Sequence, residues 1–401
     1  MLNLTRLWAG VPTPGDNLRY GELPKAGGPS PQTQVHHRPV VVWNITRQCN
    51  LYCAHCYVAA GSQPDPLELD TQAAFQVVDQ LVGYGIPVLL LSGGEPLVRP
   101  DILEVARYAA TRGLRVSLST NGTLLTPNVV SGLKEAGVAY IGASIDGPEA
   151  VNDKFRGSQG AFRQALEGIH TALGAGFRVS LRFTLTPYNY QYLSQVFDLV
   201  EQERIPRVCV YHLAYAGRGA RIASRADLSH EETRRAVDLC LERTENLYRK
   251  GLETEVLTVD NHADAAYLAI RVLQERPSRA AEVLRLLGRN GGNSSGVGIG
   301  AIGPRGDVHA DQFSHHYSFG NVRERPFGLI WEDTSHPLMA GLKARPRPLE
   351  GRCGRCPALA LCNGNLRVRA ETATGNPWGP DPSCYLTDRE LQTVGEALDD
   401  F

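Results

Sequence analysis

The stretch PVVVWNITRQCNLYCAHC, residues 39–56, joins an apolar, β-branched run to three cysteines, Cys49, Cys53 and Cys56. The apolar run predicts a buried strand. The cysteines follow that strand at its C-terminal end, which carries the chemistry in barrels and open α/β sheets. A structural zinc site takes four protein ligands. A group of three therefore leaves one position of a metal centre open.

The pattern of this stretch is repeated along the first half of the chain. Short β-branched runs alternate with amphipathic segments, which predicts an α/β fold with a parallel sheet covered by helices. Six units of about 30 residues are too few for a closed eight-unit barrel, so we predict a partial (β/α)6 barrel. The predicted strands are 39–46, 87–92, 114–119, 139–145, 178–185 and 206–212, and the predicted helices lie near 71–84, 100–112, 126–136, 160–176 and 190–204.

Three further regions flank the predicted barrel, which spans residues 39–220. Residues 1–38 are rich in Gly and Pro, show no periodicity and predict an irregular N-terminal lead-in. Residues 221–295 predict a helical linker region. Residues 296–401 are loop-rich and cysteine-rich, and they begin with a predicted hairpin whose turn is GPRG at 303–306. A metal centre can hold such a region together in place of a large core, so we expect an auxiliary cluster domain here.

The composition excludes several classes of protein. The chain has 401 residues, of which 42% are hydrophobic, with 41 basic and 42 acidic side chains. This balance is unlike the one-sided basic surface of a general nucleic-acid binder. No run approaches the roughly 18 apolar residues of a membrane-spanning helix, and the N-terminus lacks a signal-peptide pattern. We therefore expect a cytoplasmic protein that binds neither nucleic acid nor membrane.

Most of the nine cysteines fall into two groups. In a reducing compartment, clustered thiols indicate a metal centre or catalysis more often than disulfides. Thiolates are the ligands of iron–sulfur clusters, and three of them leave one iron of a four-iron cluster free for a substrate or cofactor. The alternatives for the first group are a zinc site completed by His55 and reduced cysteines without metal. Cys209 and Cys240 stand alone and are predicted to be small buried hydrophobic residues.

The motif GGEP at 93–96 follows the second predicted strand. Together with the cysteine spacing, it resembles the radical SAM superfamily over residues 39 to about 215. The resemblance implies that the open iron binds the amino and carboxylate groups of S-adenosylmethionine (SAM), whose reductive cleavage gives a 5′-deoxyadenosyl radical. For Arg182 the resemblance implies a pair with the methionine carboxylate, and the alternative is an ordinary ion pair inside the barrel. The implied cofactor-binding residues at the strand ends are Gly93, Gly94, Glu95, Asn121, Ser144, Asp146 and Arg182.

The second cysteine group comprises Cys353, Cys356, Cys362 and Cys384. Four thiols match a closed site, and their spacing fits zinc as well as a four-iron cluster. The group resembles the SPASM and twitch extensions of radical SAM enzymes, which carry auxiliary clusters. Because only four cysteines are present and Asn365 stands where many members have another, the resemblance implies one auxiliary cluster. We therefore expect two [4Fe–4S] clusters, the second used in electron relay or in support of the substrate pocket.

Several further strings, among them NDKFRGSQGAF at 152–162 and FGNVRERPF at 319–327, are typical of a narrower group. They resemble the NirJ group of heme d1 biosynthesis and the related AhbC group of the siroheme-dependent heme pathway. The resemblance implies an enzyme that removes side chains from an iron tetrapyrrole such as didecarboxysiroheme. NirJ proteins act on propionate side chains, whereas AhbC proteins remove acetates and leave methyl groups. Breaking such C–H bonds requires a cofactor-derived radical, and an electron donor such as ferredoxin or flavodoxin is implied.

A substrate of this kind presents carboxylates and an iron atom. Within DVHADQFSHHYSFG at 307–320, His309 follows the predicted turn and is the candidate axial ligand of the iron, ahead of His315 and His316. No acid–base or nucleophilic catalytic residue is predicted. Arginines in the family-like strings are candidate partners for the carboxylates, with a role as ordinary surface residues as the alternative: Arg156, Arg218, Arg323 and Arg367.

Two other functions fit parts of the pattern. A peptide-modifying radical SAM maturase shares the two-cluster layout. Such maturases often have an N-terminal peptide-recognition domain, however, and residues 1–38 are too short and too rich in Gly and Pro for one. A metal-binding scaffold without enzymatic activity does not account for a three-thiol loop and GGEP at adjacent strand ends.

Overall fold

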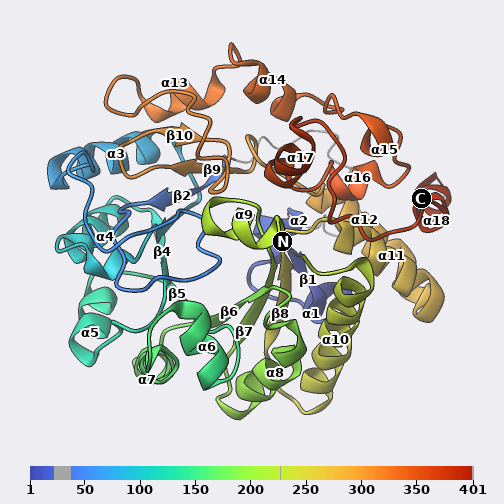
Figure 1. Ribbon diagram of the computed structural model, residues 1–401, viewed down its shortest axis with the longest axis horizontal. Helices are drawn as coiled ribbons and strands as arrows, with labels where there is room; N and C mark the ends of the chain where they lie inside the picture. The colour runs from blue at the N-terminus through green and yellow to red at the C-terminus, as the bar shows by residue number, and fades with distance from the viewer. Residues whose placement is uncertain (22–37, 226, 400–401) are drawn as a thin grey trace, which may run out of the picture.

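Parallel strands joined by helices build one curved sheet in the computed structural model, which describes residues 1–21, 38–225 and 227–399 (Figure 1). Within these residues the strands are β1 (Leu2–Asn3), β2 (Val40–Asn44), β3 (Val88–Ser92), β4 (Arg115–Thr120), β5 (Tyr140–Ser144), β6 (Val179–Leu185), β7 (Arg207–His212), β8 (Glu255–Val259), β9 (Ile299–Ile302) and β10 (Val308–His309). Their order in the sheet is β1-β8-β7-β6-β5-β4-β3-β2-β9-β10. Strands β2 to β8 are parallel, β9 pairs in parallel with β2, and β1 and β10 are antiparallel.

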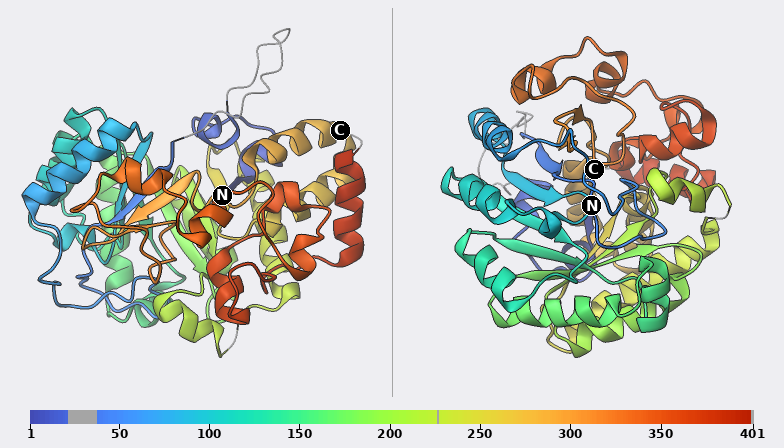
Figure 2. Two further views of the ribbon diagram at one scale, coloured as in Figure 1. Left: turned by 90° about the horizontal axis from the view of Figure 1, so that it is seen from above. Right: turned by 60° about the vertical axis from the view of Figure 1, so that its left-hand side comes forward.

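Helices that connect the parallel strands lie around the outside of the sheet, and the C-terminal segment lies across the side of β9 and β10 (Figures 1 and 2). The larger helices are α3 (Thr71–Tyr84), α4 (Ile102–Thr111), α5 (Pro127–Glu135), α6 (Glu149–Arg156), α7 (Ala161–Gly174), α8 (Leu193–Gln202), α10 (His230–Arg249), α11 (Ala263–Glu275), α12 (Ala280–Asn290), α17 (Arg367–Thr374) and α18 (Asp388–Asp399). The shorter ones are α1 (Leu4–Leu7), α2 (Asp16–Tyr20), α9 (Gly217–Ala223), α13 (Phe327–Glu332), α14 (Pro337–Lys343), α15 (Gly351–Gly354) and α16 (Leu359–Cys362).

Local sequence signals define the ends of these helices. Asp70 caps α3 by accepting a hydrogen bond from the Ala73 N–H at 2.8 Å, and Gly85 ends the same helix in the left-handed region. Ser229 and Glu232 form a reciprocal capping box at the start of α10. The six strands predicted from the apolar runs are confirmed as β2 to β7, and with them the predicted series of parallel strands.

Two parts of the prediction are wrong. Residues 221–295 were expected to be a helical linker region, yet EVLTV at 255–259 forms β8, a fully buried strand parallel to β7. Residues 1–21 were expected to be irregular, yet β1 pairs antiparallel with β8 and is followed by α1 and α2. The rest of the predicted lead-in, residues 22–37, lies outside the described residues. The predicted hairpin is confirmed as β9 and β10.

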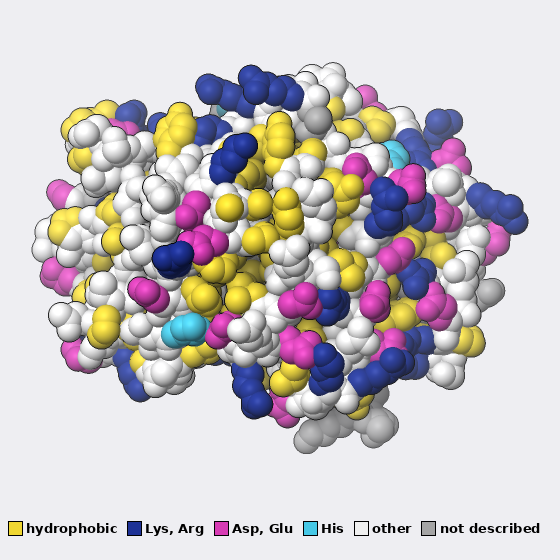
Figure 3. Space-filling model, turned by 60° about the horizontal axis from the view of Figure 1, so that its bottom comes forward, with side chains coloured by type: hydrophobic (Ala, Val, Ile, Leu, Met, Phe, Trp, Pro, Cys, Tyr) yellow, Lys and Arg dark blue, Asp and Glu magenta, His cyan; other side chains and the backbone are white. Residues whose placement is uncertain are grey.

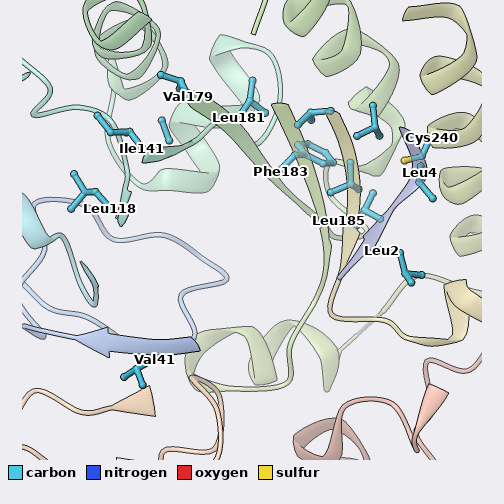
Figure 4. Close-up of a cluster of buried hydrophobic side chains, with 14 of the residues drawn as sticks. Leu2, Leu4, Val41, Leu118, Ile141, Val179, Leu181, Phe183, Leu185 and Cys240 are labelled. Carbon is cyan, nitrogen blue, oxygen red and sulfur yellow. The ribbon is translucent and has the colours of Figure 1, made fainter. Parts of the chain in front are cut away.

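The hydrophobic core lies between the sheet and its helices. Figure 4 shows Leu118, Ile141, Val179 and Phe183 on β4 to β6, which are fully buried. Each such side chain contributes about 1.5–3 kcal/mol relative to exposure. Leu2 and Leu4 of the N-terminal segment and Cys240 of α10 belong to the same cluster. Cys209 is also buried, so the prediction that the two lone cysteines are small core residues is confirmed.

A buried ionic cluster fastens the N-terminal segment to the barrel. Glu255, the first residue of β8, accepts hydrogen bonds from Thr13 Oγ1 at 2.8 Å and Arg19 Nη1 at 2.7 Å. Arg178 and Arg207 pair with its other carboxylate oxygen. Burial favours protonation of Glu255, but the arginines outweigh it and hold its pKa below the ordinary value. This cluster lies at the N-terminal ends of the strands, away from the cysteine loop.

The surface carries both signs of charge. On the face shown in Figure 3, basic and acidic side chains are interspersed, with apolar side chains between them. None of the described helices is long and apolar enough to cross a membrane.

Candidate functional site

The first cysteine group lies in the loop of residues 45–61 that follows β2. Because β2 to β6 are parallel, this loop meets the C-terminal ends of the neighbouring strands. Cys49 and Cys53 are buried, and Cys56 is half-buried. Burial raises the pKa of Cys49 to about 12, so the thiol is protonated in the absence of a metal. Metal binding at this loop therefore releases protons.

Backbone N–H groups of the loop point at two of the sulfur atoms. The Leu51 N–H donates to Cys49 Sγ at 3.4 Å, and the Ala60 N–H donates to Cys56 Sγ at 3.4 Å. Hydrogen bonds of this kind stabilise thiolates and contribute to the reduction potential of iron–sulfur clusters. The loop is thus folded to stabilise the thiolates that metal binding produces.

Two side chains from outside the cysteine loop, one after a strand and one at the end of a helix, also donate to these sulfurs. Asn121 Nδ2 lies 3.9 Å from Cys49 Sγ, and Arg156 Nη1 lies 3.7 Å from Cys53 Sγ. Asn121 follows β4 and Arg156 ends α6, so the donors come from outside the cysteine loop. The chemistry of this donor set fits three thiolate ligands of an iron–sulfur cluster.

The GGEP motif packs directly against the cysteine loop. The Gly94 N–H donates to the Thr46 carbonyl at 2.7 Å, and the Glu95 N–H donates to the Gln48 carbonyl at 2.8 Å. A Cβ at Gly93 would lie 2.5 Å from the Thr46 oxygen, and one at Gly94 would clash with the Gln48 oxygen. Only glycine permits this approach of two backbones. The motif therefore fixes the position of the cysteine loop.

The Glu95 carboxylate joins the ends of β3 and β4. It is fully buried and accepts hydrogen bonds from the Asn121 N–H at 2.7 Å, the Thr120 hydroxyl at 2.8 Å and the Leu97 N–H at 3.1 Å. Burial raises its pKa to about 7 even though these hydrogen bonds favour the ionised form. The side chain is occupied within the protein, so its contribution to the rim is structural.

Asp146, which follows β5, is the centre of a buried polar network. Its carboxylate pairs with Arg156 and accepts a hydrogen bond from the Thr184 N–H at 2.9 Å. His55 Nε2 lies 3.7 Å from the same carboxylate, and its ring stacks on Phe155 with centroids 4.6 Å apart. Burial lowers the pKa of His55 to about 4, so the ring is neutral. His55 Nε2 thus faces Asp146, whereas its buried Nδ1 has no hydrogen-bond partner, so the zinc site completed by this histidine stays an alternative for metal analysis to test.

Arg182 on β6 is the cation of the barrel interior. A Cβ at Gly142 on β5 would clash with its guanidinium, so the glycine makes room for it. Arg182 Nη1 donates to Ser119 Oγ, and its buried Nε has no hydrogen-bond partner. Among the described residues no carboxylate lies within ion-pair distance of it. The alternative of an ordinary ion pair thus finds no partner among the described residues. Ser144, in register with Arg182, ends β5 at the same rim.

Two of the arginines predicted to bind substrate instead hold the cysteine loop. Arg218 donates from Nε to the Cys53 carbonyl and from Nη1 to the Ala60 carbonyl, each at 2.7 Å, and its guanidinium lies 4.0 Å above the Tyr52 ring. Arg156 is committed to Cys53 Sγ and the Asp146 carboxylate. Linear sequence placed both near the site but did not show which way they point.

The other two predicted arginines are also engaged within the chain. Buried Arg367 donates to the Pro377 and Gly379 carbonyls at 3.0 and 2.8 Å. Exposed Arg323 donates to the Leu67 carbonyl at 3.3 Å. None of the four predicted arginines is among the residues that line the large cavity beside the cysteine loop.

That cavity has a volume of about 710 Å³, which is within the range of pockets for organic ligands. Its walls come from the end of β2, the cysteine loop, residues 215–217, the β9–β10 hairpin and α17. Two arginines that the sequence analysis missed, Arg47 and Arg305, are part of the wall. Arg47 stands two residues before Cys49, and Arg305 lies in the hairpin turn. The sequence signal that could have identified these two arginines was their position next to predicted site residues.

Three histidines line the cavity, including the predicted His309. His309 Nδ1 lies 2.7 Å from the Tyr317 carbonyl and donates to it, which leaves Nε2 unprotonated with a free lone pair. Its ring meets His315 edge-on with centroids 5.4 Å apart, and His315 lies parallel to Tyr57 at 5.9 Å. Burial lowers the pKa of His309, and that of His315 to about 3, so both rings are neutral. His316 is exposed.

The four cysteines of the second group line one further cavity. Its remaining wall is mostly apolar, from α11 and the C-terminal segment, and includes Ala263, Ala266, Leu359, Leu386 and Leu391. Arg352 Nη1 donates to Cys384 Sγ at 3.4 Å. Asn365, which stands where a further cysteine was considered, accepts from the His262 N–H and donates to Asn261 Oδ1, each at 2.7 Å.

The cysteine placement bears on the choice between zinc and a cluster. No three His, Cys, Asp or Glu side chains among the described residues converge on one metal-ion position. Thiolates that share a tetrahedral zinc ion lie about 3.8 Å apart, because each Zn–S bond is about 2.3 Å. In a four-iron cluster each thiolate binds a different iron, so the sulfur atoms stand farther apart. The metal-free thiols leave both zinc and a four-iron cluster as candidate occupants of the two cysteine groups.

Comparisons with known proteins agree with this geometry. A family model for the radical SAM superfamily matches residues 43–200. The chain is 52% identical to Fe-coproporphyrin III synthase of Methanosarcina barkeri, over 98% of this chain and 99% of that protein. It is 41% identical to pre-heme d1 synthase of Dinoroseobacter shibae, over 89% and 88%. The fold is similar to that of Streptococcus suis SuiB bound to S-adenosylmethionine, with a TM-score of 0.66 and 17% identity over 88% of this chain and 78% of that chain. The chain therefore belongs to the radical SAM superfamily, whose members use a four-iron cluster and SAM.

Proposed function

We propose that this radical SAM enzyme removes carboxyalkyl side chains from an iron tetrapyrrole of the didecarboxysiroheme type. The observation that carries the proposal is the 52% identity to Fe-coproporphyrin III synthase over 98% of the chain. The cavity beside the cysteine loop supports it, because the cavity holds neutral histidines for an iron atom and arginines for carboxylates. Losing an unactivated side chain requires breaking a strong C–H bond, and the radical that SAM supplies on reductive cleavage meets that requirement.

Cys49, Cys53 and Cys56 hold the first cluster in this proposal. Their sulfur atoms already accept hydrogen bonds from backbone and side-chain donors, as ligating thiolates require. Two alternatives to an iron–sulfur cluster at this loop are a bound zinc ion and thiols without metal. Analysis of the iron and zinc content of the protein distinguishes the three states.

The rim residues bind SAM beside that cluster. Arg182 receives the methionine carboxylate through its unpaired Nε, in a charge-assisted hydrogen bond. The N–H groups of Gly94 and Glu95 are committed to the cysteine loop, so this segment offers its carbonyl oxygens to the methionine amino group. Asn121 and Ser144 lie at neighbouring strand ends and contribute polar contacts. Asp146 acts indirectly, by holding Arg156.

The substrate lies in the 710 Å³ cavity. His309 Nε2 ligates the tetrapyrrole iron, since its lone pair is free and its tautomer is fixed by the Tyr317 carbonyl. Arg47 and Arg305 bind substrate carboxylates. Arg47 makes no ion pair among the described residues, and Arg305 is half-exposed and paired with Asp65 at 2.7 Å, a contact that a substrate carboxylate can replace.

The side chains removed are acetates, and the product is Fe-coproporphyrin III. Identity to the enzyme named for that product is 52%, against 41% to pre-heme d1 synthase. Loss of propionates, as in the NirJ group, is the second candidate. The peptide-maturase alternative is weaker, since the likeness to SuiB is at 17% identity and concerns the fold alone.

Cys353, Cys356, Cys362 and Cys384 hold a second four-iron cluster. Support comes from the cavity that the four thiols line together. α17 begins five residues after Cys362 and lines the substrate cavity through Val368, Glu371 and Thr372. The second cluster thereby supports the substrate pocket or relays electrons. A ferredoxin or flavodoxin in the cytoplasm supplies the electrons.

Anaerobic turnover tests the proposal. Reconstituted protein is incubated with SAM, dithionite and didecarboxysiroheme, and the tetrapyrrole is analysed by mass spectrometry. Loss of acetates supports Fe-coproporphyrin III formation, and loss of propionates supports the second candidate. An unchanged tetrapyrrole, with SAM cleavage stimulated by a precursor peptide encoded nearby, contradicts the proposal and favours the maturase.

A further inference from the structure

We propose that Arg156 and Asp146 act as an oriented charge pair that sets the reduction potential of the SAM-binding cluster, with Arg156 raising the potential and Asp146 lowering it. The inference rests on the proposed ligand role of Cys53. Neither residue is then a ligand of the cluster, and each acts on it through position and charge.

The contact that carries this inference lies in a fully buried setting. Arg156 is 7% exposed and Asp146 is 0% exposed. The guanidinium bridges the two anionic groups, because Nη1 is 3.7 Å from Cys53 Sγ and Nη2 pairs with the Asp146 carboxylate. The cation therefore touches the sulfur, and the carboxylate stands behind it.

Backbone contacts hold the guanidinium in place. The end of α6 is joined to the cysteine loop by hydrogen bonds from the Ala54 N–H to the Phe155 carbonyl at 2.9 Å and from the Tyr52 N–H to the Arg156 carbonyl at 3.2 Å. A Cβ at Gly157 would lie 2.7 Å from the Tyr52 oxygen, so the helix ends tightly against the loop. The separation of Arg156 from Cys53 is thus fixed by the backbone of both segments.

The Asp146 carboxylate is fixed in the same way. The Thr184 N–H donates to Oδ1 at 2.9 Å, and the Asp146 N–H donates to Asn152 Oδ1 at 2.9 Å. His55 Nε2 lies 3.7 Å from Oδ2 of the same carboxylate. The arrangement of the pair is therefore fixed. The Arg156 cation is the group nearer to Cys53 Sγ, and the Asp146 carboxylate is the farther one.

The sign of each effect follows from electrostatics. Reduction adds an electron to the cluster and its thiolates, and a nearby cation stabilises that extra negative charge. Water is excluded from this site, so the interaction is stronger than between exposed groups. Net charge and hydrogen bonds to sulfur are established determinants of cluster potentials. Removal of Arg156 is expected to lower the midpoint potential, and removal of the Asp146 charge is expected to raise it.

The test is a redox titration of anaerobically reconstituted full-length protein, followed by electron paramagnetic resonance. The signal that changes on addition of SAM identifies the first cluster and separates it from the second. Arg156→Gln should shift the midpoint of that signal to more negative potential, and Asp146→Asn should shift it to more positive potential. Arg156→Lys keeps the charge and should lie between wild type and Arg156→Gln. Arg163→Gln is the matched control, because Arg163 is exposed and pairs with Glu149 at the surface.

Opposite shifts in the two variants support the charge pair. Unchanged midpoints, or shifts of the same sign, overturn it, because a merely structural role would disturb the cluster in one direction. If Arg156→Gln does not retain iron, Arg156→Lys and Asp146→Asn decide the matter. Failure of the ligand proposal is distinguishable, since Cys53→Ala would then leave the iron content and the SAM-sensitive signal unchanged.

Discussion

The two cysteine sites of this protein are built by different physical means. The first lies on a loop at the rim of the parallel sheet, and polar donors reach its sulfur atoms from the loop backbone, from Asn121 and from Arg156. One side of that loop borders a 710 Å³ cavity. The second lies among short helices and is enclosed mostly by apolar side chains of α11 and the C-terminal segment.

This difference matches the proposed separation of a reactive cluster from a supporting one. A site stabilised by hydrogen bonds at a strand edge can leave one position for an exchangeable ligand. A site closed by four thiols and apolar packing excludes such a ligand. We therefore expect cysteine substitutions at the two sites to have different effects on SAM cleavage and on tetrapyrrole turnover.

The largest effect is expected from the first site. Changing Cys49, Cys53 and Cys56 to Ala should remove about half the iron of a protein with two four-iron clusters, and all cleavage of SAM. Iron analysis and detection of 5′-deoxyadenosine measure the two losses. Retention of SAM cleavage would show that these cysteines do not hold the reactive cluster.

A more selective loss is expected from the second site. Cys353→Ala with Cys356→Ala should also remove about half the iron, yet SAM should still be cleaved when substrate is absent. Tetrapyrrole turnover should fail. If substrate-independent cleavage disappears as well, the two sites are not separable, and the second cluster is needed to fold the barrel. Stoichiometric zinc in anaerobically purified protein would identify the second site as a zinc site.

A change remote from both sites should affect stability alone. Glu255→Gln leaves buried arginines without their anion, which costs about 3–5 kcal/mol of unfolding free energy. The folded-state pKa of Glu255 is lowered, so its contribution is present above the ordinary glutamate pKa and is lost as the pH falls through the folded value. The melting-temperature difference between wild type and variant should therefore shrink toward acid pH.

Glu231→Gln is the control for that stability change. Glu231 forms an exposed pair with Arg235, which is worth little, so its loss should leave the melting temperature close to wild type. Iron content and SAM cleavage at pH 7 should be retained in both glutamate variants. A loss of either cluster in Glu255→Gln would mean that the ionic cluster also supports the metal sites.

The smallest effect is spectroscopic. His309→Ala should alter the shift of the Soret band that accompanies binding of an iron tetrapyrrole, because the axial imidazole is removed. SAM binding should be unchanged. His170→Ala is the control, since His170 is exposed, pairs with Glu203 and does not line the cavity. Identical spectra for wild type and His309→Ala would eliminate axial ligation by this residue and leave the cavity assignment intact.

Strongly periodic features could be predicted from sequence. Runs such as RVSLRFTL predicted β6 almost to the residue, because burial on both faces selects continuous apolar residues. The two-residue β1 carries no periodicity, and it exists only because β8 is there to pair with it. EVLTV was passed over because it lies between long helices, although its β-branched residues were visible.

The candidate site shows the same difference between features that the sequence reveals and features that depend on tertiary contacts. The cysteines and GGEP are defined by linear spacing, so the sequence located them together. The direction of a long side chain depends on tertiary contacts. Arg156 and Arg218 were therefore assigned to substrate although both hold the cysteine loop, and Arg47 was overlooked although it lines the cavity.

The hydrogen bonds from Arg218 to the cysteine loop limit which residues around the cavity can change during evolution. Gly217 is part of the cavity wall, and a side chain there would clash with the Tyr57 carbonyl. Selection for a new substrate cannot reshape that turn without disturbing the loop that carries the reactive cysteines. The turn of the β9–β10 hairpin, residues 303–306, also lines the cavity, but its hydrogen bonds outside the hairpin reach residues 65–69 and 321–322. Divergence among descendants of this protein is therefore expected in the hairpin turn, with the glycine–arginine turn kept unchanged.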